Sequence, residues 1–336
     1  LIEQHRSGRS PDTVRFLRFP PTVLVGRHQA IRREVHVDLC QLEGVGIARR
    51  ITGGGAIYLD EGQAGWELVL SRKPLPMNSL ADYSRAICEA VALGLSRAFG
   101  IAASFRPRND IEVAGRKLCG TGGFFDGDTL IYQGTVLVDV TPERMLRFLN
   151  VPRGKLDDLD RDAPQARITT VKSLLGDAPG LSAVHDAILL GLSQRLGIEL
   201  QPGAPTGAEE ALAAKLHDTE IGTDAFVNAI DEPDDADVLE GTAAGAGGTL
   251  RAFVRIEGSG AARRIREVLL TGDFFVSPPR FIFDLEATLR GLPLPQVPSA
   301  IDNFLAAHRP AVLTLRSEEH TSELQSRLHL VCRLLL

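Results

Sequence analysis

"RRITGGGAIYLD", residues 49–60, places two arginines directly before three glycines and an apolar run with high β propensity. Glycine loses more conformational entropy on ordering than any other residue, so a triplet indicates either a flexible loop or a backbone that a ligand approaches closely. One interpretation is a surface turn with two solvated arginines. The other is a ligand cradle, in which bare backbone follows a thin apolar tail and arginine donates to phosphate or carboxylate. Motifs elsewhere in the chain decide between the two.

Composition narrows the class of protein. The chain has 336 residues, of which 44% are hydrophobic and 24% charged, as in ordinary globular proteins. A net charge of −6 argues against a nucleic-acid partner bound by bulk electrostatics, and no apolar run is long enough to span a membrane. The four cysteines form no CxxC pair and the histidines no metal-binding array. We therefore expect no metal site and a reducing, cytoplasmic environment.

Strands and helices alternate along the chain, which predicts an α+β fold. Apolar residues at helical spacing predict a helix that begins after Ser79 and ends at Gly100, and a second helix over 182–197. "DIEVAGRKLCGTGGFF" (110–125) predicts two strands joined by an Ala-Gly turn. "VRFLRF" (14–19) and "PTVLVGRHQ" (21–29) predict a strand pair around Pro20-Pro21.

The predicted domains follow from changes in composition. Residues 1–204 form the large domain, whose N-terminus we expect to be truncated because the chain begins at Leu1. Residues 205–249 form a connecting segment with an acidic run and the Gly/Ala stretch "GTAAGAGG" (241–248) as linker. Residues 250–315 form a smaller α+β domain, predicted as a β-hairpin followed by helices near 281–292 and 299–308. Residues 316–336 differ in composition and are expected to be a non-native tail outside the fold.

Four segments carry the motifs, and neither a Walker A motif nor a GxGxxG fingerprint occurs. They are "VGRHQ" (25–29), "RRITGGGAIYLDEGQ" (49–63), "RNDIEVAGRKLCGTGG" (108–123) with "YQGTVLVD" (132–139), and "GDFF" (272–275). Each is weak alone, but their order and spacing resemble the lipoate–protein ligase family of the biotin/lipoate ligase superfamily. "RITTV" (167–171) resembles a later family segment, and "GDFF" with its hairpin resembles the ligases' C-terminal accessory domain. The resemblance covers residues 10 to 310.

The resemblance implies a fold, an activity and partners. The fold is an α+β catalytic domain, with a mixed β-sheet flanked by helices, plus a smaller α+β accessory domain. The activity is ATP-dependent conversion of lipoate, or octanoate, to acyl-AMP, followed by transfer to a lysine of a lipoyl-domain protein. Mg²⁺ is expected with ATP. The acceptor is a glycine-cleavage H-type protein, a dehydrogenase E2 subunit or a specialised lipoate-binding protein.

The resemblance also implies a set of site residues. Lys117 matches the family's catalytic lysine, which would stabilise negative charge on the α-phosphate, although an exposed strand lysine is the ordinary alternative. Asp110 would hold the site's cations or the adenosine side, unless it is only a turn residue after Asn109. The residues predicted to bind substrate or lipoyl-AMP are Arg50, Gly53, Gly54, Gly55, Tyr58, Asn109, Asp110, Gly120, Gly134 and Thr135.

Several positions depart from the family pattern. Leu59 stands where many ligases have His, Gln63 where many have Asn, and Gln133 where His is common. Cys119 stands where Ser is common, and it could carry an acyl group or simply fill a small apolar space. Two alternatives therefore stay open beside the ligase: an ATP-independent octanoyl or lipoyl transferase that uses a thioester donor, and a non-catalytic lipoate-binding homologue.

Overall fold

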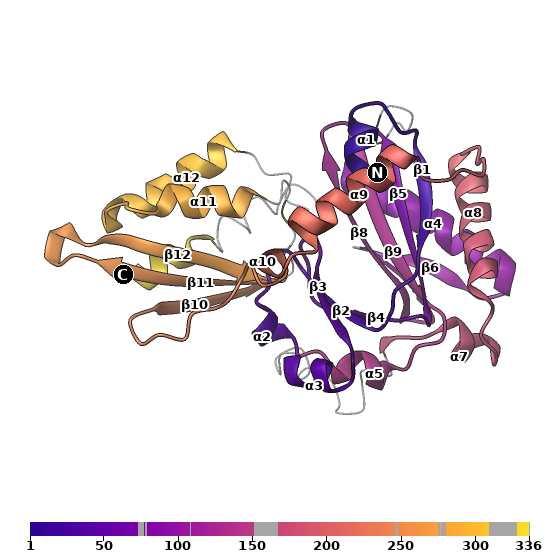
Figure 1. The fold of residues 1–336 in the computed structure, drawn as a ribbon, viewed down its shortest axis with the longest axis horizontal. Coiled ribbons are helices and arrows are strands. Elements are labelled where there is room, and N and C mark those ends of the chain that lie inside the picture. Colours follow the sequence, from indigo (N-terminus) through magenta and orange to yellow (C-terminus); the bar gives the residue numbers. More distant parts are fainter. Residues whose placement is uncertain are drawn as a thin grey trace. The chain divides into compact units, whose positions relative to one another are not determined.

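The computed structural model describes residues 1–72, 77, 79–107, 109–150, 167–245, 248–274, 276, 280–308 and 328–335. It confirms the α+β class, and the chain divides into two compact units (Figure 1). Unit 1 contains Leu1–Val23, His36–Ile47 and Ile57–Gly222, and unit 2 contains Leu24–Val35, Ala48–Ala56 and Thr223–Leu336. Two short segments from the N-terminal part of the chain thus group with the C-terminal part, which the linear division of the sequence did not anticipate.

Unit 1 is built on a six-stranded sheet in the order β1-β5-β9-β8-β7-β6. Every neighbouring pair is antiparallel. The strands are β1 (Thr13–Leu17), β5 (Gln63–Ser71), β6 (Ala103–Arg106), β7 (Asp110–Val113), β8 (Arg116–Asp126) and β9 (Thr129–Leu137).

Helices α4 (Leu80–Phe99) and α8 (Leu181–Leu196) bury one face of this sheet (Figure 1). The predicted first helix is confirmed, with a capping box between Ser79 and Asp82 and a left-handed Gly100 at its end. The two helices approach closely at a glycine on each, because a Cβ on Gly94 would lie 1.9 Å from the carbonyl oxygen of Ala187. The opposite face of the sheet carries the strand side chains that point away from α4 and α8.

The predicted strand pair around Pro20-Pro21 is wrong. Strand β1 pairs with β5, whereas β2 (Thr22–Val25) joins a separate sheet in the order β3-β2-β4. Prolines have no N–H for a hairpin turn and hold the preceding residue extended, so the chain continues forward instead of folding back. The remaining elements of unit 1 and of this small sheet are α1 (Ile2–Arg6), α3 (Val37–Leu42), β3 (Gly46–Arg49), β4 (Ile57–Leu59), α5 (Pro142–Arg147), α7 (Val171–Leu175), α9 (Gly207–Leu216) and η2 (His217–Ile221).

Unit 2 contains a three-stranded antiparallel sheet with helices packed into one apolar core (Figure 1). The predicted hairpin and the two helices after it are confirmed. A third strand occupies the Gly/Ala stretch that the sequence suggested as a linker, because ladder hydrogen bonds use backbone and need no side chains. The elements are α2 (Ile31–Glu34), α10 (Asp224–Val227), β10 (Leu239–Gly245), β11 (Gly248–Glu257), η3 (Gly260–Ala262), β12 (Arg264–Gly272), α11 (Phe281–Leu289), η4 (Leu294–Gln296), α12 (Val297–Ala307) and α14 (Leu330–Leu335).

The C-terminal tail also differs from the expectation that it lies outside the fold. In the part that the structure describes, Leu328 and Val331 are fully buried in the core of unit 2. Leu334 lies against Gly241, where a Cβ would come within 2.6 Å of its Cδ2. Leu328, Val331 and Leu334 therefore pack on the core of unit 2 at helical spacing. Among the described residues, no helix combines the length and hydropathy that crossing a bilayer requires.

Glu286 places a carboxyl group inside the apolar core of unit 2. It lies on α11, is only 4% exposed, and accepts a hydrogen bond of 2.7 Å from the backbone N–H of Leu270 on edge strand β12. Burial raises the pKa of Glu286 to about 7, although the Leu270 N–H and Arg290 oppose the shift. The protonated form is therefore the one that the folded core favours.

We predict that Glu286→Gln removes a pH dependence from the stability of unit 2. A carboxyl whose pKa is raised on folding stabilises fully below its unfolded value near 4.5, and this stabilisation is lost as pH rises through 7. At pH 8 the variant should be more stable by up to about 3 kcal/mol. Calorimetric unfolding between pH 4.5 and 8 measures it. Asp284→Asn on the exposed side of the same helix is the control, and an equal slope in wild type and Glu286→Gln would contradict the prediction.

Candidate active site

The β7–β8 hairpin carries the central residues of the candidate site. Its turn consists of Ala114 and Gly115, whose φ angles of 51° and 78° are both left-handed, as a two-residue hairpin turn requires. The predicted Ala-Gly turn is thus confirmed. Asp110 at the start of β7 then lies opposite Gly120 on β8.

A row of small and polar residues crosses the sheet on the face away from α4 and α8. Gly65, Thr135, Gly120 and Asp110 are successive cross-strand partners on β5, β9, β8 and β7. Directly paired residues share a face. The next row, which includes Ile111, Cys119 and Val136, is buried in the helix-covered core. The row with Asp110 therefore belongs to the opposite face.

A β-bulge on β8 places Lys117 on the same face as Asp110. Ile111 pairs with Cys119, but the next residue of β7, Glu112, pairs with Lys117, so Leu118 is an extra residue. Without the insertion, strand alternation would turn Lys117 into the core with Cys119. Leu118 and Cys119 are both fully buried instead. The bulge is what aims the lysine away from the core.

The Lys117 side chain lies across Gly120 and reaches Asp110. Its Nζ is 2.7 Å from Oδ1 of Asp110, and a Cβ on Gly120 would lie 2.8 Å from both Cε and Nζ. Arg106 holds the other carboxylate oxygen at 2.6 Å. Burial alone would raise the pKa of Asp110, but Lys117 and Arg106 outweigh it and hold the pKa below its usual value. Asp110 is therefore an anion at neutral pH that fixes the lysine's ammonium group.

The "RITTV" segment meets the site beside the lysine. Ile168 forms a parallel bridge with Lys117, and the N–H of Thr169 donates to the carbonyl of Lys117 at 2.8 Å. A distant part of the chain thus fixes the backbone from which the Lys117 side chain extends.

Asn109 immediately precedes strand β7 and is hydrogen-bonded to Thr121 on strand β8. Its carbonyl accepts hydrogen bonds from N–H and Oγ1 of Thr121 at 2.9 Å and 2.8 Å, and its side-chain amide donates to the carbonyl of Thr121. The residue therefore sits beside Asp110, with its amide donor already engaged by strand β8.

Gly134 and Tyr58, which the sequence places among the ligand-binding residues, have packing roles. A Cβ on Gly134 would lie 2.2 Å from the ring of Trp66, so the glycine faces the helix-covered core, whereas Thr135 faces the row with Gly120. Tyr58 is fully buried, stacks on Phe148 and accepts a hydrogen bond from Arg144 at 2.8 Å. Gly134 and Thr135 face opposite sides of the sheet because neighbours in a strand point to opposite faces.

Arg50 and the glycine triplet belong to unit 2, and there the arginine braces the loop. Nη2 of Arg50 donates to the carbonyls of Gly53 and Gly55 at 2.8 Å each, and Nη1 donates to the carbonyl of Leu24 at 3.0 Å. Burial lowers the pKa of Arg50 to about 10, so the group is still a cation at neutral pH. Gly54 has a φ of 93°, which favours glycine.

Arg49 is a structural residue that the sequence analysis missed. It is 4% exposed and donates to the carbonyls of Gly26, Gln29 and Val227 at 2.7 to 2.9 Å. Burial, followed by the charge of Arg27, lowers the pKa of Arg49 to about 10. The adjacent arginines gave no signal that separated their roles, because Arg49 is the last residue of strand β3 and Arg50 lies beyond it.

Of the departures from the family pattern, Leu59, Gln63 and Cys119 are buried and Gln133 is half-buried. Leu59 is 2% exposed, and Gln63 donates to the carbonyl of Tyr58 at 3.1 Å. Gln133 donates to the carboxylate of Glu67 on the neighbouring strand. Cys119 is fully buried, and this burial raises the pKa of its thiol far above the usual value, with Cys88 adding to the shift. A thiol held in its protonated form is a poor nucleophile.

The predicted residues thus fall into two clusters. Unit 1 brings together Lys117, Asp110, Asn109, Gly120 and Thr135, and unit 2 holds Arg50 with Gly53, Gly54 and Gly55. Arg106 was also missed by the sequence analysis, although its charge four residues before Asp110 was a usable signal; it lies on β6, directly opposite Asp110 on β7. Within the described ranges, no group of three or more His, Cys, Asp or Glu side chains could hold a metal ion.

The chain belongs to the family described as the lipoyl protein ligase A/B catalytic domain, whose model matches residues 1–193. It is 27% identical over 183 residues to a protein of Mycoplasma pneumoniae named "Probable lipoate-protein ligase A", covering 54% of this chain and 52% of that protein. It is also 27% identical to an octanoyltransferase LipM of Kyrpidia tusciae, covering 63% of this chain and 85% of the relative. The family therefore includes both ligases and transferases.

Solved structures show the same fold. A bipartite lipoate protein ligase from Thermoplasma acidophilum, studied with its E2 lipoyl domain, is 26% identical with a TM-score of 0.59, covering 67% of this chain and 88% of that one. A lipoate-protein ligase A bound with ATP is 25% identical, with a TM-score of 0.58 over 68% and 91% of the two chains. LipL1 of P. falciparum, at 17% identity and a TM-score of 0.66, shares the fold over 94% of this chain and 86% of its own.

We predict that Gly120→Ala displaces Lys117 without unfolding the protein. The new Cβ would occupy the position of the lysine's flexible end, so the side chain must move away from Asp110 while the backbone keeps its place. If Lys117 is the catalytic group that the family resemblance implies, this displacement should lower the rate on the order of a hundredfold. Lipoylation rate and thermal melting together measure the effect.

Gly134→Ala is the matched control on the neighbouring strand. Its Cβ would meet the buried ring of Trp66, so we expect a loss of about 1–3 kcal/mol in stability. An equal loss of stability in Gly120→Ala and Gly134→Ala would contradict the prediction that the Lys117 side chain can move away from residue 120.

Proposed function

We propose that this protein is an ATP-dependent lipoate–protein ligase, which converts lipoate, or octanoate, to acyl-AMP and transfers the acyl group to a lysine of a lipoyl domain. The observation that carries the proposal is the Lys117 ammonium group, held 2.7 Å from Asp110 above Gly120 on the face of the sheet away from the helices. Family membership and the neighbour bound with ATP support it.

The proposed reaction has two steps. A carboxylate oxygen of the acid attacks the α-phosphorus of ATP, and the bond to pyrophosphate breaks. The amine of the acceptor lysine then attacks the acyl carbon of the mixed anhydride, loses a proton, and AMP leaves. In both steps negative charge grows on oxygens around the α-phosphate, where a fixed ammonium group stabilises the transition state. Asp110 is the positioning residue that orients Lys117 for this role.

The glycine triplet and Arg50 are proposed to bind the acyl-adenylate. Bare backbone at Gly53, Gly54 and Gly55 would let an apolar tail approach closely. Within the part of the chain that the structure describes, the polar partners of Arg50 are carbonyls, which leave its charge uncompensated. A carboxylate or phosphate is the kind of group that such a cation attracts.

Mg²⁺ would be held by the phosphates of ATP and by water in this proposal, as is usual for this ion. The described residues offer no cluster of metal-ligating side chains for it. The chain's own contribution to charge neutralisation would come from Lys117.

The proposed acceptor is a lipoyl domain with an exposed lysine. The bipartite archaeal ligase was studied with its E2 lipoyl domain, which supports this class of partner. Whether the acceptor is an E2 subunit, a glycine-cleavage H-type protein or a specialised lipoate-binding protein would follow from comparing the three as substrates.

A thioester-dependent transferase is the second candidate, because octanoyltransferases LipM are among the relatives. That reaction needs a nucleophilic thiol. Cys40, Cys88 and Cys119 are buried, and burial raises the pKa of each thiol. Cys332, the fourth cysteine, lies in the C-terminal tail. The burial of the three thiols in unit 1 favours the ligase.

We expect the unmodified 336-residue chain to catalyse ATP–pyrophosphate exchange that requires lipoate, and Lys117→Gln to reduce the rate by about 10²–10³. Lys172→Gln is the control, because Lys172 forms an exposed ion pair with Asp139 and should not affect the rate. Lipoate that binds without any exchange would reject the ligase and support a non-catalytic lipoate-binding homologue.

Cys119→Ser should leave this exchange essentially unchanged, because the buried thiol takes no part in the proposed reaction. Acyl transfer to a lipoyl domain from an octanoyl thioester, measured without ATP, is the complementary assay. Transfer in that assay that disappears in Cys119→Ser would establish the transferase instead.

A further inference from the structure

The turn after strand β12 contacts both N-terminal segments of unit 2. The N–H of Gly272 donates to the carbonyl of His28 at 2.9 Å, and the carbonyl of Phe274 accepts from the N–H of Gly54 at 3.0 Å. Gly54 is the central residue of the glycine triplet, and all four residues belong to unit 2. Backbone hydrogen bonds thus join the "GDFF" motif to two motifs, "VGRHQ" and the glycine triplet, that lie more than 200 residues earlier in the sequence.

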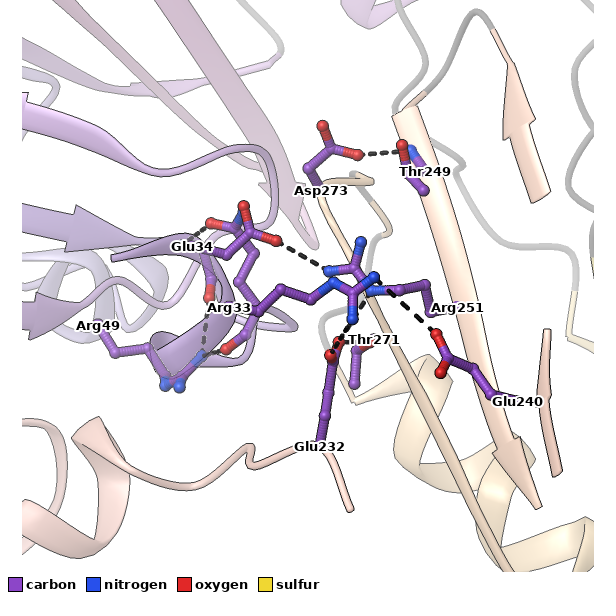
Figure 2. Close-up of polar contacts among 11 residues, drawn as sticks. Arg33, Glu34, Arg49, Glu232, Glu240, Thr249, Arg251, Thr271 and Asp273 are labelled. Carbon is purple, nitrogen blue, oxygen red and sulfur yellow. Dashed lines mark hydrogen bonds and ion pairs between the residues drawn. The ribbon is translucent and has the colours of Figure 1, made fainter. Parts of the chain in front are cut away.

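The turn itself has a defined backbone. Gly272 has a φ of 149°, and a Cβ there would lie 1.9 Å from the carbonyl oxygen of Thr249. Asp273 fixes the turn to strand β11, because its N–H donates to the carbonyl of Thr249 and its carboxylate accepts from the N–H of the same residue (Figure 2). The carbonyl of Phe274 therefore extends from a turn whose backbone is fixed by hydrogen bonds to Thr249.

The two N-terminal segments are in turn packed against each other and against this turn. A Cβ on Gly26 would lie 2.0 Å from the carbonyl oxygen of Gly54, so only glycine fits between the segments. His28 is 1% exposed and stacks on Phe274, with ring centroids 5.2 Å apart, and it also contacts Phe283. This packing explains why "VGRHQ", "TGGG" and "GDF" occur in one sequence; the second phenylalanine of "GDFF", Phe275, lies outside the described residues.

A buried ion-pair network is a second attachment between the segment that ends at Glu34 and the sheet of unit 2. Arg251 on β11 is 5% exposed and contacts Glu34 and Glu232 at 2.8 Å each, and Thr271 donates to Glu232 at 2.7 Å (Figure 2). Arg33 contacts the same Glu232 at 3.1 Å. Buried charges gain little net stability, but a network with specific partners favours one arrangement of the segments that carry them. The segment that ends at Glu34 is thereby held on the sheet of unit 2.

We propose that the Gly272–Phe274 turn positions the glycine triplet for the acyl ligand, and that Phe274 is a positioning residue of the active site. This inference rests on the proposed function. Three consecutive glycines would otherwise sample many conformations, and a ligand that had to order them would bind more weakly. The bond from Gly54 to Phe274, supported by the stack on His28, orders the loop before the ligand arrives.

Phe274→Leu and Phe281→Leu are a matched pair for the test. Both phenylalanines are 3% exposed in the same core, but Phe274 stacks on His28, whereas Phe281 packs against Phe304. Both variants should lose similar thermal stability. Only Phe274→Leu should raise KM for lipoate in the exchange assay, by about tenfold with kcat little changed, because preorganisation of the loop affects binding.

Amide hydrogen exchange of the full chain without ligand tests the positioning independently of activity. The N–H of Gly54 should exchange at least about tenfold faster in Phe274→Leu than in Phe281→Leu or wild type, because an opened hydrogen bond exposes its donor to water. His28→Ala, which removes the stack from the other side, should act in the same way if Phe274→Leu fails to fold. Equal protection of Gly54 in both leucine variants, or an equal change in KM, would overturn the inference; an inactive wild type with the expected exchange pattern would reject only the proposed function.

Discussion

A one-residue bulge at Leu118 is the constraint on which the candidate active site depends. Regular pairing of β7 with β8 would put Lys117 on the same face as Cys119, inside the helix-covered core. The bulge turns the lysine to the other face, and the missing side chain at Gly120 leaves a path along which it reaches Asp110. The Ala114-Gly115 turn sets the register of the hairpin, and the later segment around Thr169 supports the backbone of the lysine. Each of these features contributes to one contact between an ammonium group and a carboxylate.

The two arginines before the glycine triplet, Arg49 buried and Arg50 half-buried, are cations whose hydrogen-bond partners, within the described ranges, are backbone carbonyls. Arg50 donates hydrogen bonds to the carbonyls of Gly53 and Gly55 at the two ends of the triplet. Arg49 donates to the carbonyl of Gly26 in the other N-terminal segment of unit 2. Carbonyl oxygens satisfy N–H groups but do not cancel the charge, so the loop retains a positive potential in a desolvated setting. Such a loop suits an anionic ligand. Its backbone geometry is in turn supported by the turn that ends at Phe274.

Local patterns predicted local structure well. The helix from Leu80 to Phe99 follows from apolar spacing and from caps at Ser79 and Gly100, all of which act within a few residues. The predictions that failed concerned partners distant in sequence. The strands on either side of Pro20-Pro21 are real, but they join different sheets, and the Gly/Ala stretch at 241–248 contributes a strand because β11 is available to pair with it. Gly134, which the family resemblance placed among the ligand-binding residues, lies on the strand face toward Trp66, and its ligand contact stays a prediction.

The sequence by itself determined the fold class, the family resemblance and the central residues Lys117, Asp110 and Gly120, because ordered motifs with fixed spacing carry that information without coordinates. Only the tertiary structure decided which face of the sheet each residue occupies, that Cys119 is sealed in the core, and that residues 24–35 and 48–56 group with the C-terminal unit. The physical reason is that a bulge, a strand partner or a buried ion pair such as Arg251 with Glu34 depends on residues far apart along the chain. Their pairing is set by packing and register, which no short stretch of sequence contains.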